Sequence, residues 1–150
     1  MAVFFLLLAT SCSKDSVEPE VVPSSQNLKA IEAELLDIVN DHRSSMGFAP
    51  LEYSAVAYDF ASVHTDYMIS QGGLSHDNFT ARASDIASET NAEAVAENVA
   101  KDYSSAVEAF EGWLNSASHR KTIEGNFTHT GISVKKDVQG NYYYTQLFYR

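Results

Sequence analysis

Three stretches of the chain carry apolar residues at helical spacing, with polar residues between them. The first starts at Leu28 and predicts a helix that ends near Met46-Gly47. A second helix is expected after Pro50 and up to Gly72-Gly73, and a third over residues 104–115. Each pattern places apolar side chains on one side only, so each helix is expected to pack one face against a core.

The last part of the chain alternates apolar and polar residues instead. Residues 131–136 and 142–149 predict two paired strands, joined by a turn at Gln139-Gly140-Asn141. Residues 74–88 are polar and predict a loop with a helical turn near 80–86, while residues 94–99 are short and ambiguous. Helices around a small antiparallel sheet make an α+β domain of three layers over residues 28–150.

The first residues form a different kind of segment. An unbroken apolar run over residues 3–9 is too short to span a bilayer, which needs about 20 apolar residues. Small residues and then Cys12 follow it, a pattern similar to a bacterial lipobox. We therefore expect residues 1–11 to be a signal peptide of the lipoprotein type and Cys12 to be lipidated. A buried first strand with a core cysteine is the alternative.

Residues 12–27 contain two prolines, acids and serines but little to bury, and predict a flexible tether. No Lys or Arg precedes the apolar run, which departs from the usual signal and favours a true start upstream of Met1.

The composition of the chain argues against several classes of function. The chain of 150 residues has 10 Lys and Arg against 20 Asp and Glu, and a net charge of -10 does not suit binding to nucleic acid. Cys12 is the only cysteine, so an intramolecular disulfide and a cysteine-based zinc site are excluded. We expect a monomer, held together by packing, that reaches the membrane through its lipid anchor only.

Several short motifs occur in a specific order. They are Asn40-Asp41-His42-Arg43, Ser75-His76, Ala96-Glu97-Asn98, Trp113-Leu114-Asn115-Ser116, Ser118-His119-Arg120 and Tyr144-Thr145-Gln146. In this order and spacing the chain resembles the CAP superfamily of cysteine-rich secretory proteins, antigen 5 and pathogenesis-related 1 proteins, in its cysteine-free bacterial branch. The resemblance covers residues 28–150 and implies an α-β-α sandwich and an extracytoplasmic location.

The resemblance also implies a cleft lined by two histidines and two glutamates. Matched by motif, the histidines are His76 and His119, which could hold Zn²⁺ or another divalent metal, and the first glutamate is Glu97. The position of the second glutamate holds Ser116, so the expected cleft of His76, Glu97, Ser116 and His119 lacks one carboxylate. Neutral imidazole suits such ions, and a nearby carboxylate can orient a histidine or accept a proton.

The other histidines are assigned to structure. His42 and His64 are expected to be helix-face or packing residues, and His129 is not placed in the cleft. Asn40 and Arg43 are expected to make polar contacts to the sheet. No Gly-x-Ser-x-Gly turn and no phosphate-binding glycine loop occurs in the sequence.

Three functions follow from these residues. The first is an anchored binding module, not an enzyme, whose cleft holds a metal and a small-molecule, peptide or cell-envelope ligand. The second is a metal-dependent hydrolase or peptidase that acts on peptide or cell-envelope material, with Glu97 as the catalytic base. The third is a carrier of lipid or sterol, an activity that the resemblance implies for some eukaryotic members.

Overall fold

A computed structural model of the chain describes residues 25–150. The expected signal peptide, the lipidation site Cys12 and most of the expected tether lie outside these described residues. The elements in order are β1 Gln26–Asn27, α1 Lys29–Ser45, β2 Glu52–Tyr53, α2 Ala55–Gln71, α3 Phe79–Thr90, β3 Val95–Lys101, α4 Ala106–Leu114, α5 Ala117–Ile123, β4 His129–Lys136 and β5 Tyr142–Tyr149.

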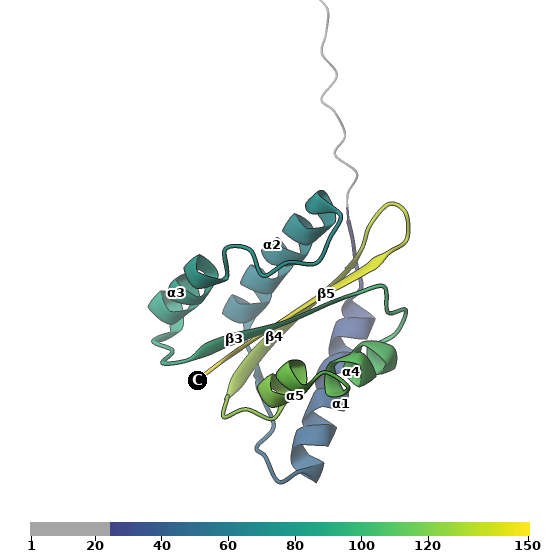
Figure 1. Cartoon of the computed structure of the whole chain (residues 1–150). Coiled ribbons are helices and arrows are strands. Elements are labelled where there is room, and N and C mark those ends of the chain that lie inside the picture. The colour runs from purple at the N-terminus through teal and green to yellow at the C-terminus, as the bar shows by residue number, and fades with distance from the viewer. Residues whose placement is uncertain (1–24) are drawn as a thin grey trace, which may run out of the picture.

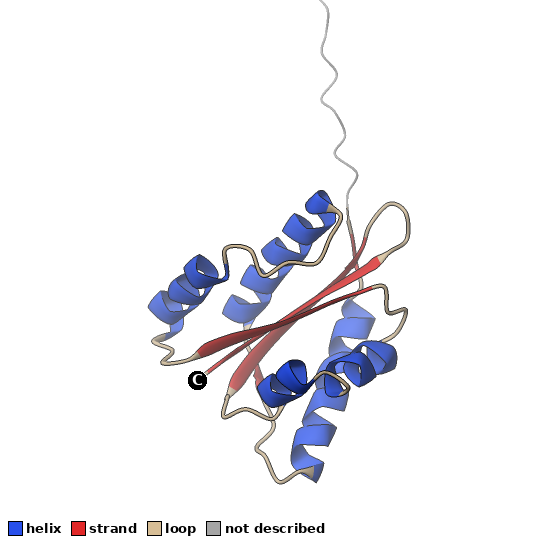
Figure 2. Cartoon of the chain, viewed as in Figure 1, coloured by secondary structure: helices blue, strands red, loops and turns tan. Residues whose placement is uncertain are grey.

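The strands form one sheet between two layers of helices (Figures 1 and 2). The order is β1-β4-β5-β3, with antiparallel neighbours, and β2 pairs with β4 in parallel. Helices α2 and α3 cover one face, whereas α1, α4 and α5 cover the other. The expected three-layer α+β sandwich is therefore confirmed. No helix among residues 25–150 is long and apolar enough to cross a membrane.

The hydrophobic core is divided between the two faces of the sheet. On the α1 and α4 face, Trp113 is buried and its indole Nε1–H donates to the carbonyl oxygen of Val99, 3.1 Å away. On the other face, Ala57 and Ala61 of α2 bring that helix close to Gly131 of β4. A Cβ atom at residue 131 would overlap with the main chain of Ala57, so the small residues set this helix-to-sheet distance.

Asn40 and Arg43 stabilise the end of α1, but not through the sheet as expected. The Asn40 side chain exchanges two hydrogen bonds with the main chain of Leu51, at 2.7 and 3.0 Å. Arg43 is buried and donates to main-chain carbonyls at Ala49 (2.9 Å), at Ile123 at the end of α5 (2.6 Å) and at Gly125 (2.9 Å).

Other local predictions need correction. The expected loop at 74–88 overlaps with α3, which runs to Thr90 as a full helix of 12 residues and buries Arg82 and Ile86 against the rest of the domain. Residues 94–99, which were ambiguous, belong to the strand β3, and the short helix α5 was not predicted. The sheet also begins at Gln26, inside the expected tether, because β1 pairs with the end of β4. These elements are short or polar, and long-range packing determines them rather than local pattern.

Candidate functional site

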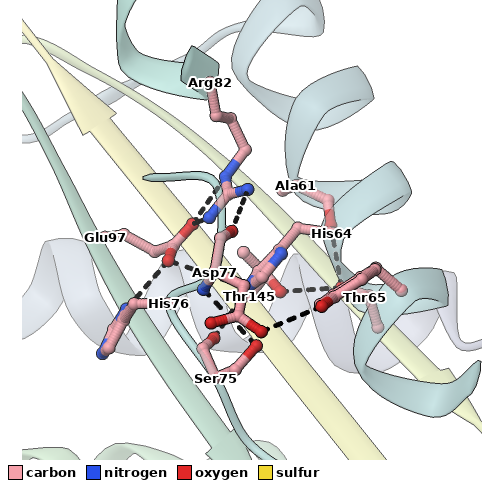
Figure 3. Close-up of polar contacts among 10 residues, drawn as sticks. Ala61, His64, Thr65, Ser75, His76, Asp77, Arg82, Glu97 and Thr145 are labelled. Carbon is pink, nitrogen blue, oxygen red and sulfur yellow. Dashed lines mark hydrogen bonds and ion pairs between the residues drawn. The ribbon is translucent and has the colours of Figure 1, made fainter. Parts of the chain in front are cut away.

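Glu97 is the centre of a polar cluster on β3, and its side chain is almost fully buried, with 1% exposed. Figure 3 shows its carboxylate between His76 on one side and Arg82 and His64 on the other. Oε1 accepts a hydrogen bond from Nδ1 of His76 at 2.8 Å. Oε2 lies 2.8 Å from Nε and 2.6 Å from Nη2 of Arg82. Both carboxylate oxygens are therefore engaged by charged or polar partners.

Each partner of Glu97 comes from a different element. Arg82 lies in the first turn of α3, His64 lies in the middle of α2, and His76 lies in the connection between these helices. His64 is buried, and its Nε2 lies 3.7 Å from Glu97 Oε1. The buried carboxylate of Glu97 on β3 is thus contacted by side chains from α2, from α3 and from the connection between them.

The connection that carries His76 is fixed at the residues on either side. His64 donates from Nε2 to the carbonyl oxygen of Ser75 at 2.8 Å, and Arg82 donates from Nη1 to that of Asp77 at 3.1 Å. Tyr67 donates from its hydroxyl to Asp77 Oδ2 at 2.9 Å. His76 itself keeps 55% of its side chain exposed. The main chain on either side of His76 is therefore fixed, and the Nε2 atom of its imidazole faces solvent.

His119 lies on α5, which packs against β3 on the opposite face of the sheet from α2 and α3. The side chain of Asn98, next to Glu97 on β3, donates to the main-chain carbonyl of His119 at 3.2 Å. The imidazole Nδ1 of His119 is buried and has no hydrogen-bond partner among residues 25–150. Burial, and to a smaller extent the charge of His76, lower the pKa of His119. A half-buried, neutral imidazole with an unused nitrogen is therefore present near His76.

Burial also controls the charge of His64. It lowers the pKa of His64 below the usual value of 6.5, and this effect exceeds the opposite effect of the Glu97 carboxylate. His64 is consequently neutral at pH 7, with its proton on Nε2 toward Ser75. Arg82 is then the charged side chain nearest to the buried carboxylate of Glu97.

In the cluster a buried carboxylate holds one nitrogen of an exposed imidazole. A carboxylate that accepts from Nδ1–H of a histidine fixes the tautomer and leaves the Nε2 lone pair free to bind a cation. His76 has this arrangement, and His119 offers a second imidazole. Both oxygens of Glu97 already accept from His76 or Arg82, and no group of three or more His, Cys, Asp or Glu side chains within residues 25–150 is arranged to hold a metal. The imidazoles of His76 and His119 have the chemistry to bind a divalent cation, and water or a ligand would complete its coordination.

The structure brings some of the predicted site residues together and leaves others apart. His76 and Glu97 are in direct contact, and the main chain at His119 is tied to β3 beside them. Ser116, at the N-cap position of α5, makes its side-chain hydrogen bond with Ser118 at 3.2 Å and none with the other three expected cleft residues.

Two members of the cluster were missed. Arg82 lies in a segment expected to be a loop, and His64 was assigned to packing, although it is buried and also braces the His76 segment. Phe79, Ala83 and Ile86 are apolar residues at helical spacing, a weak signal that could have indicated α3. The two remaining histidines lie elsewhere: His42 contacts Glu124, and His129 stacks on Tyr149.

Comparison with known proteins identifies the family. The model of the cysteine-rich secretory protein family (CAP) matches residues 36–148, and the chain belongs to this family. It is 31% identical over 140 residues to a Bacillus subtilis (strain 168) protein named uncharacterized membrane protein YlbC, which covers 88% of this chain and 39% of that protein. The chain therefore spans well under half the length of this curated relative.

Solved structures agree on the fold. A Bacillus anthracis extracellular protein containing an SCP domain matches with a TM-score of 0.71 and 29% identity, over 81% of this chain and 41% of that one. An outer surface protein of Borrelia burgdorferi has a TM-score of 0.75 at 16% identity, over 85% and 98% of the two chains. A cysteine-rich secretory protein of Staphylococcus aureus has a TM-score of 0.70 at 21% identity, over 83% and 39%. The last two matches concern the fold alone.

Proposed function

We propose that this chain is an extracytoplasmic, membrane-anchored binding domain in which His76 and His119 hold a divalent cation such as Zn²⁺. The observation that carries the proposal is the hydrogen bond of 2.8 Å between His76 Nδ1 and the buried Glu97. This contact orients the imidazole and leaves its outer nitrogen as a ligand. The unused, buried Nδ1 of His119 is the second supporting observation.

Glu97 has a positioning role in this proposal rather than the role of a base. Its side chain is 1% exposed, and its two oxygens are already bound by His76 and Arg82. A general base needs a free lone pair within reach of the proton that it abstracts. The geometry thus favours the binding module over the metal-dependent hydrolase as the function of this site. A bound cation would supply a positive charge and open coordination positions for an anionic or carbonyl ligand.

An extracytoplasmic location is supported by the family and by the names of its relatives. One similar protein is described as extracellular and another as a membrane protein. The lipobox-like sequence before Cys12 agrees with attachment by a lipid.

Isothermal titration of Zn²⁺ into the full-length chain tests the cation site. We expect binding in the parent and its loss in the variant His76→Ala/His119→Ala, because His64, the third imidazole of the cluster, is buried and its Nε2 is held by the carbonyl oxygen of Ser75. The matched control is His42→Ala/His129→Ala, which removes two histidines outside the site and is expected to bind like the parent. Equal binding by the parent and by the His76/His119 variant would reject the site.

The role of Glu97 is tested in the same titration. In Glu97→Gln, loss of the carboxylate that orients His76 is expected to weaken Zn²⁺ binding by about 10- to 100-fold, the usual effect of removing such a partner. An unchanged affinity in a folded Glu97→Gln variant would contradict the positioning role, even if the two histidines bind the ion.

A further inference from the structure

Asn98 and Gln146 form a polar pair on the face of the sheet that α1, α4 and α5 cover. They lie directly opposite each other on β3 and β5, and 1% and 0% of their surfaces are exposed. Because side chains alternate along a strand, Asn98 points away from the face on which Glu97 meets α2 and α3. Directly opposed side chains have their Cβ atoms about 4.5–5.5 Å apart. The two amides are therefore neighbours in the interior of the domain.

Hydrogen bonds determine which way each amide points. The hydroxyl of Thr130 donates its one proton to the carbonyl oxygen of Leu147 at 2.7 Å, so it can only accept from Gln146. Gln146 accordingly presents Nε2 to Thr130 Oγ1, at 3.2 Å. Asn98 presents Nδ2 to the main-chain carbonyl of His119, also at 3.2 Å, and a carbonyl cannot donate. In both cases a reversed amide would lose its hydrogen bond.

These orientations leave two buried oxygens without a donor. Asn98 Oδ1 and Gln146 Oε1 have no hydrogen-bond partner among residues 25–150. The same is true of Nδ1 of His119, the residue whose main-chain carbonyl accepts from Asn98. Each buried polar atom without a partner costs about 1–3 kcal/mol. Three such atoms on side chains that adjoin one another indicate a common partner, and the two amide oxygens require that it donate twice.

A single water molecule meets these requirements. It can donate its two protons to the two amide oxygens and accept one from a protonated Nδ1, which makes three hydrogen bonds, the usual number for a buried water. Burial lowers the pKa of His119, so at pH 7.5 its imidazole is neutral and carries one proton. With that proton on Nδ1, the Nε2 atom keeps its lone pair.

We propose that a buried water molecule joins Asn98 Oδ1, Gln146 Oε1 and His119 Nδ1 and holds His119 as the Nδ1–H tautomer. Asn98 and Gln146 are then positioning residues, which act on the imidazole through the water. The consequence for metal binding rests on the proposed function: both histidines offer Nε2 to the cation, His76 supported by a carboxylate and His119 by uncharged amides. A cation among the same three atoms would instead take the lone pair of Nδ1 and leave the proton on Nε2, so the tautomer distinguishes the two occupants.

The tautomer is measured in the ¹⁵N-labelled full-length chain, freed of metal with EDTA, from long-range ¹H–¹⁵N correlation spectra of the imidazoles at pH 7.5. The variant His119→Ala assigns the signals of His119 by their loss. We expect the Nδ1–H pattern for His119 and transfer of magnetisation from water to that proton. An Nε2–H pattern in the parent would overturn the proposal.

Gln146→Met removes one acceptor of the water with little change of volume and leaves the hydrogen bond from Thr130 to Leu147 in place. We expect it to convert part of His119 to the Nε2–H tautomer and to weaken Zn²⁺ binding about tenfold, a combination that a role in packing alone would not produce. The matched control Gln139→Met makes the same change at an exposed residue of the turn before β5 and is expected to behave like the parent. A folded Gln146→Met with the tautomer of the parent would refute the proposed role.

The water site and the cation site can fail separately. An Nδ1–H tautomer in a chain that binds no Zn²⁺ would support the water site and reject the cation site. Zn²⁺ binding that depends on His76 and His119, in a metal-free state with the Nε2–H tautomer of His119, would do the reverse. If Gln146→Met does not fold, the tautomer of the parent and the transfer from water still decide.

Discussion

Glu97 is a buried carboxylate whose charge is compensated mainly by Arg82. The two side chains have 1% and 8% of their surfaces exposed, and Oε2 lies 2.6 Å from Nη2. The ion pair is stable only when both side chains are present, since either one left alone would be a buried charge without solvent or a counter-ion.

We therefore expect Arg82→Met to lower the free energy of unfolding by about 3–5 kcal/mol, as is usual when one partner of a buried ion pair is removed. Urea denaturation measures this change. Arg82→Met/Glu97→Gln removes both charges and is expected to be more stable than Arg82→Met alone. If the double variant is instead less stable by the sum of the two single effects, the residues are not coupled.

His64 is expected to make the folded protein less stable as the pH falls. Its pKa is lowered in the folded protein, mainly by burial, so between that pKa and 6.5 the unfolded chain binds a proton that the native state does not. Stability is therefore full above about pH 6.5 and falls as the pH decreases below it. We expect His64→Gln to flatten the decline of Tm between about pH 7.5 and about pH 5.5. Parallel Tm curves for parent and variant would contradict this assignment.

At the scale of single residues, the candidate site residues were selected by motif resemblance and not by spacing. His76, Glu97 and His119 are 21 and 22 residues apart, a separation that no helix or strand converts into a contact. Arg82 and His64 could not be found in this way, because an isolated arginine or histidine on a helix looks the same whether it faces solvent or a buried carboxylate. Only the packing of α3 and α2 against β3 distinguishes the two cases.

The position of α2 depends on the absence of a side chain at Gly131. An added Cβ would overlap with main-chain atoms of Ala57 and Tyr58, which cannot move without displacing the helix. We expect Gly131→Ala to cost about 3 kcal/mol or more, in the upper range for overpacked cores. The matched control is Gly73→Ala, where nothing lies within 4 Å of the new atom and the effect should be within about 0.5 kcal/mol. Similar unfolding midpoints in urea for both variants would contradict this account.

The elements that sequence reasoning found are those with a strong local pattern. The helices α1, α2 and α4 and the hairpin of β4 and β5 match the expected stretches, because each has a continuous apolar face or alternation. The elements that it missed have two to twelve residues and little pattern. β1 and β2 have only two residues each and exist because β4 offers them an edge, while α3 is polar and rests on Arg82 and Ile86.

At the scale of the whole molecule, the expected lipid on Cys12 determines where the domain acts. We expect the parent to incorporate labelled fatty acid in a bacterial host and to sediment with membranes. Cys12→Ser is expected to do neither, because in the proposed lipoprotein the lipid is attached to the thiol of Cys12. Cys12→Ser that still takes up label and remains with membranes would contradict the lipoprotein assignment and leave the binding site unaffected.

The central position of the β4 and β5 hairpin has a consequence for how the chain folds. Gln26 pairs with Lys136, the side chain of Glu32 caps the N–H of Val134, and β3 pairs with β5. The first described residues thus pair with β4, and both β4 and β3 pair with β5, so little of the sheet can form until Tyr149 is available. Contacts of such high sequence separation make folding slow. A chain that emerges from a ribosome or a translocation channel in order therefore stays unfolded until nearly all of it has been released.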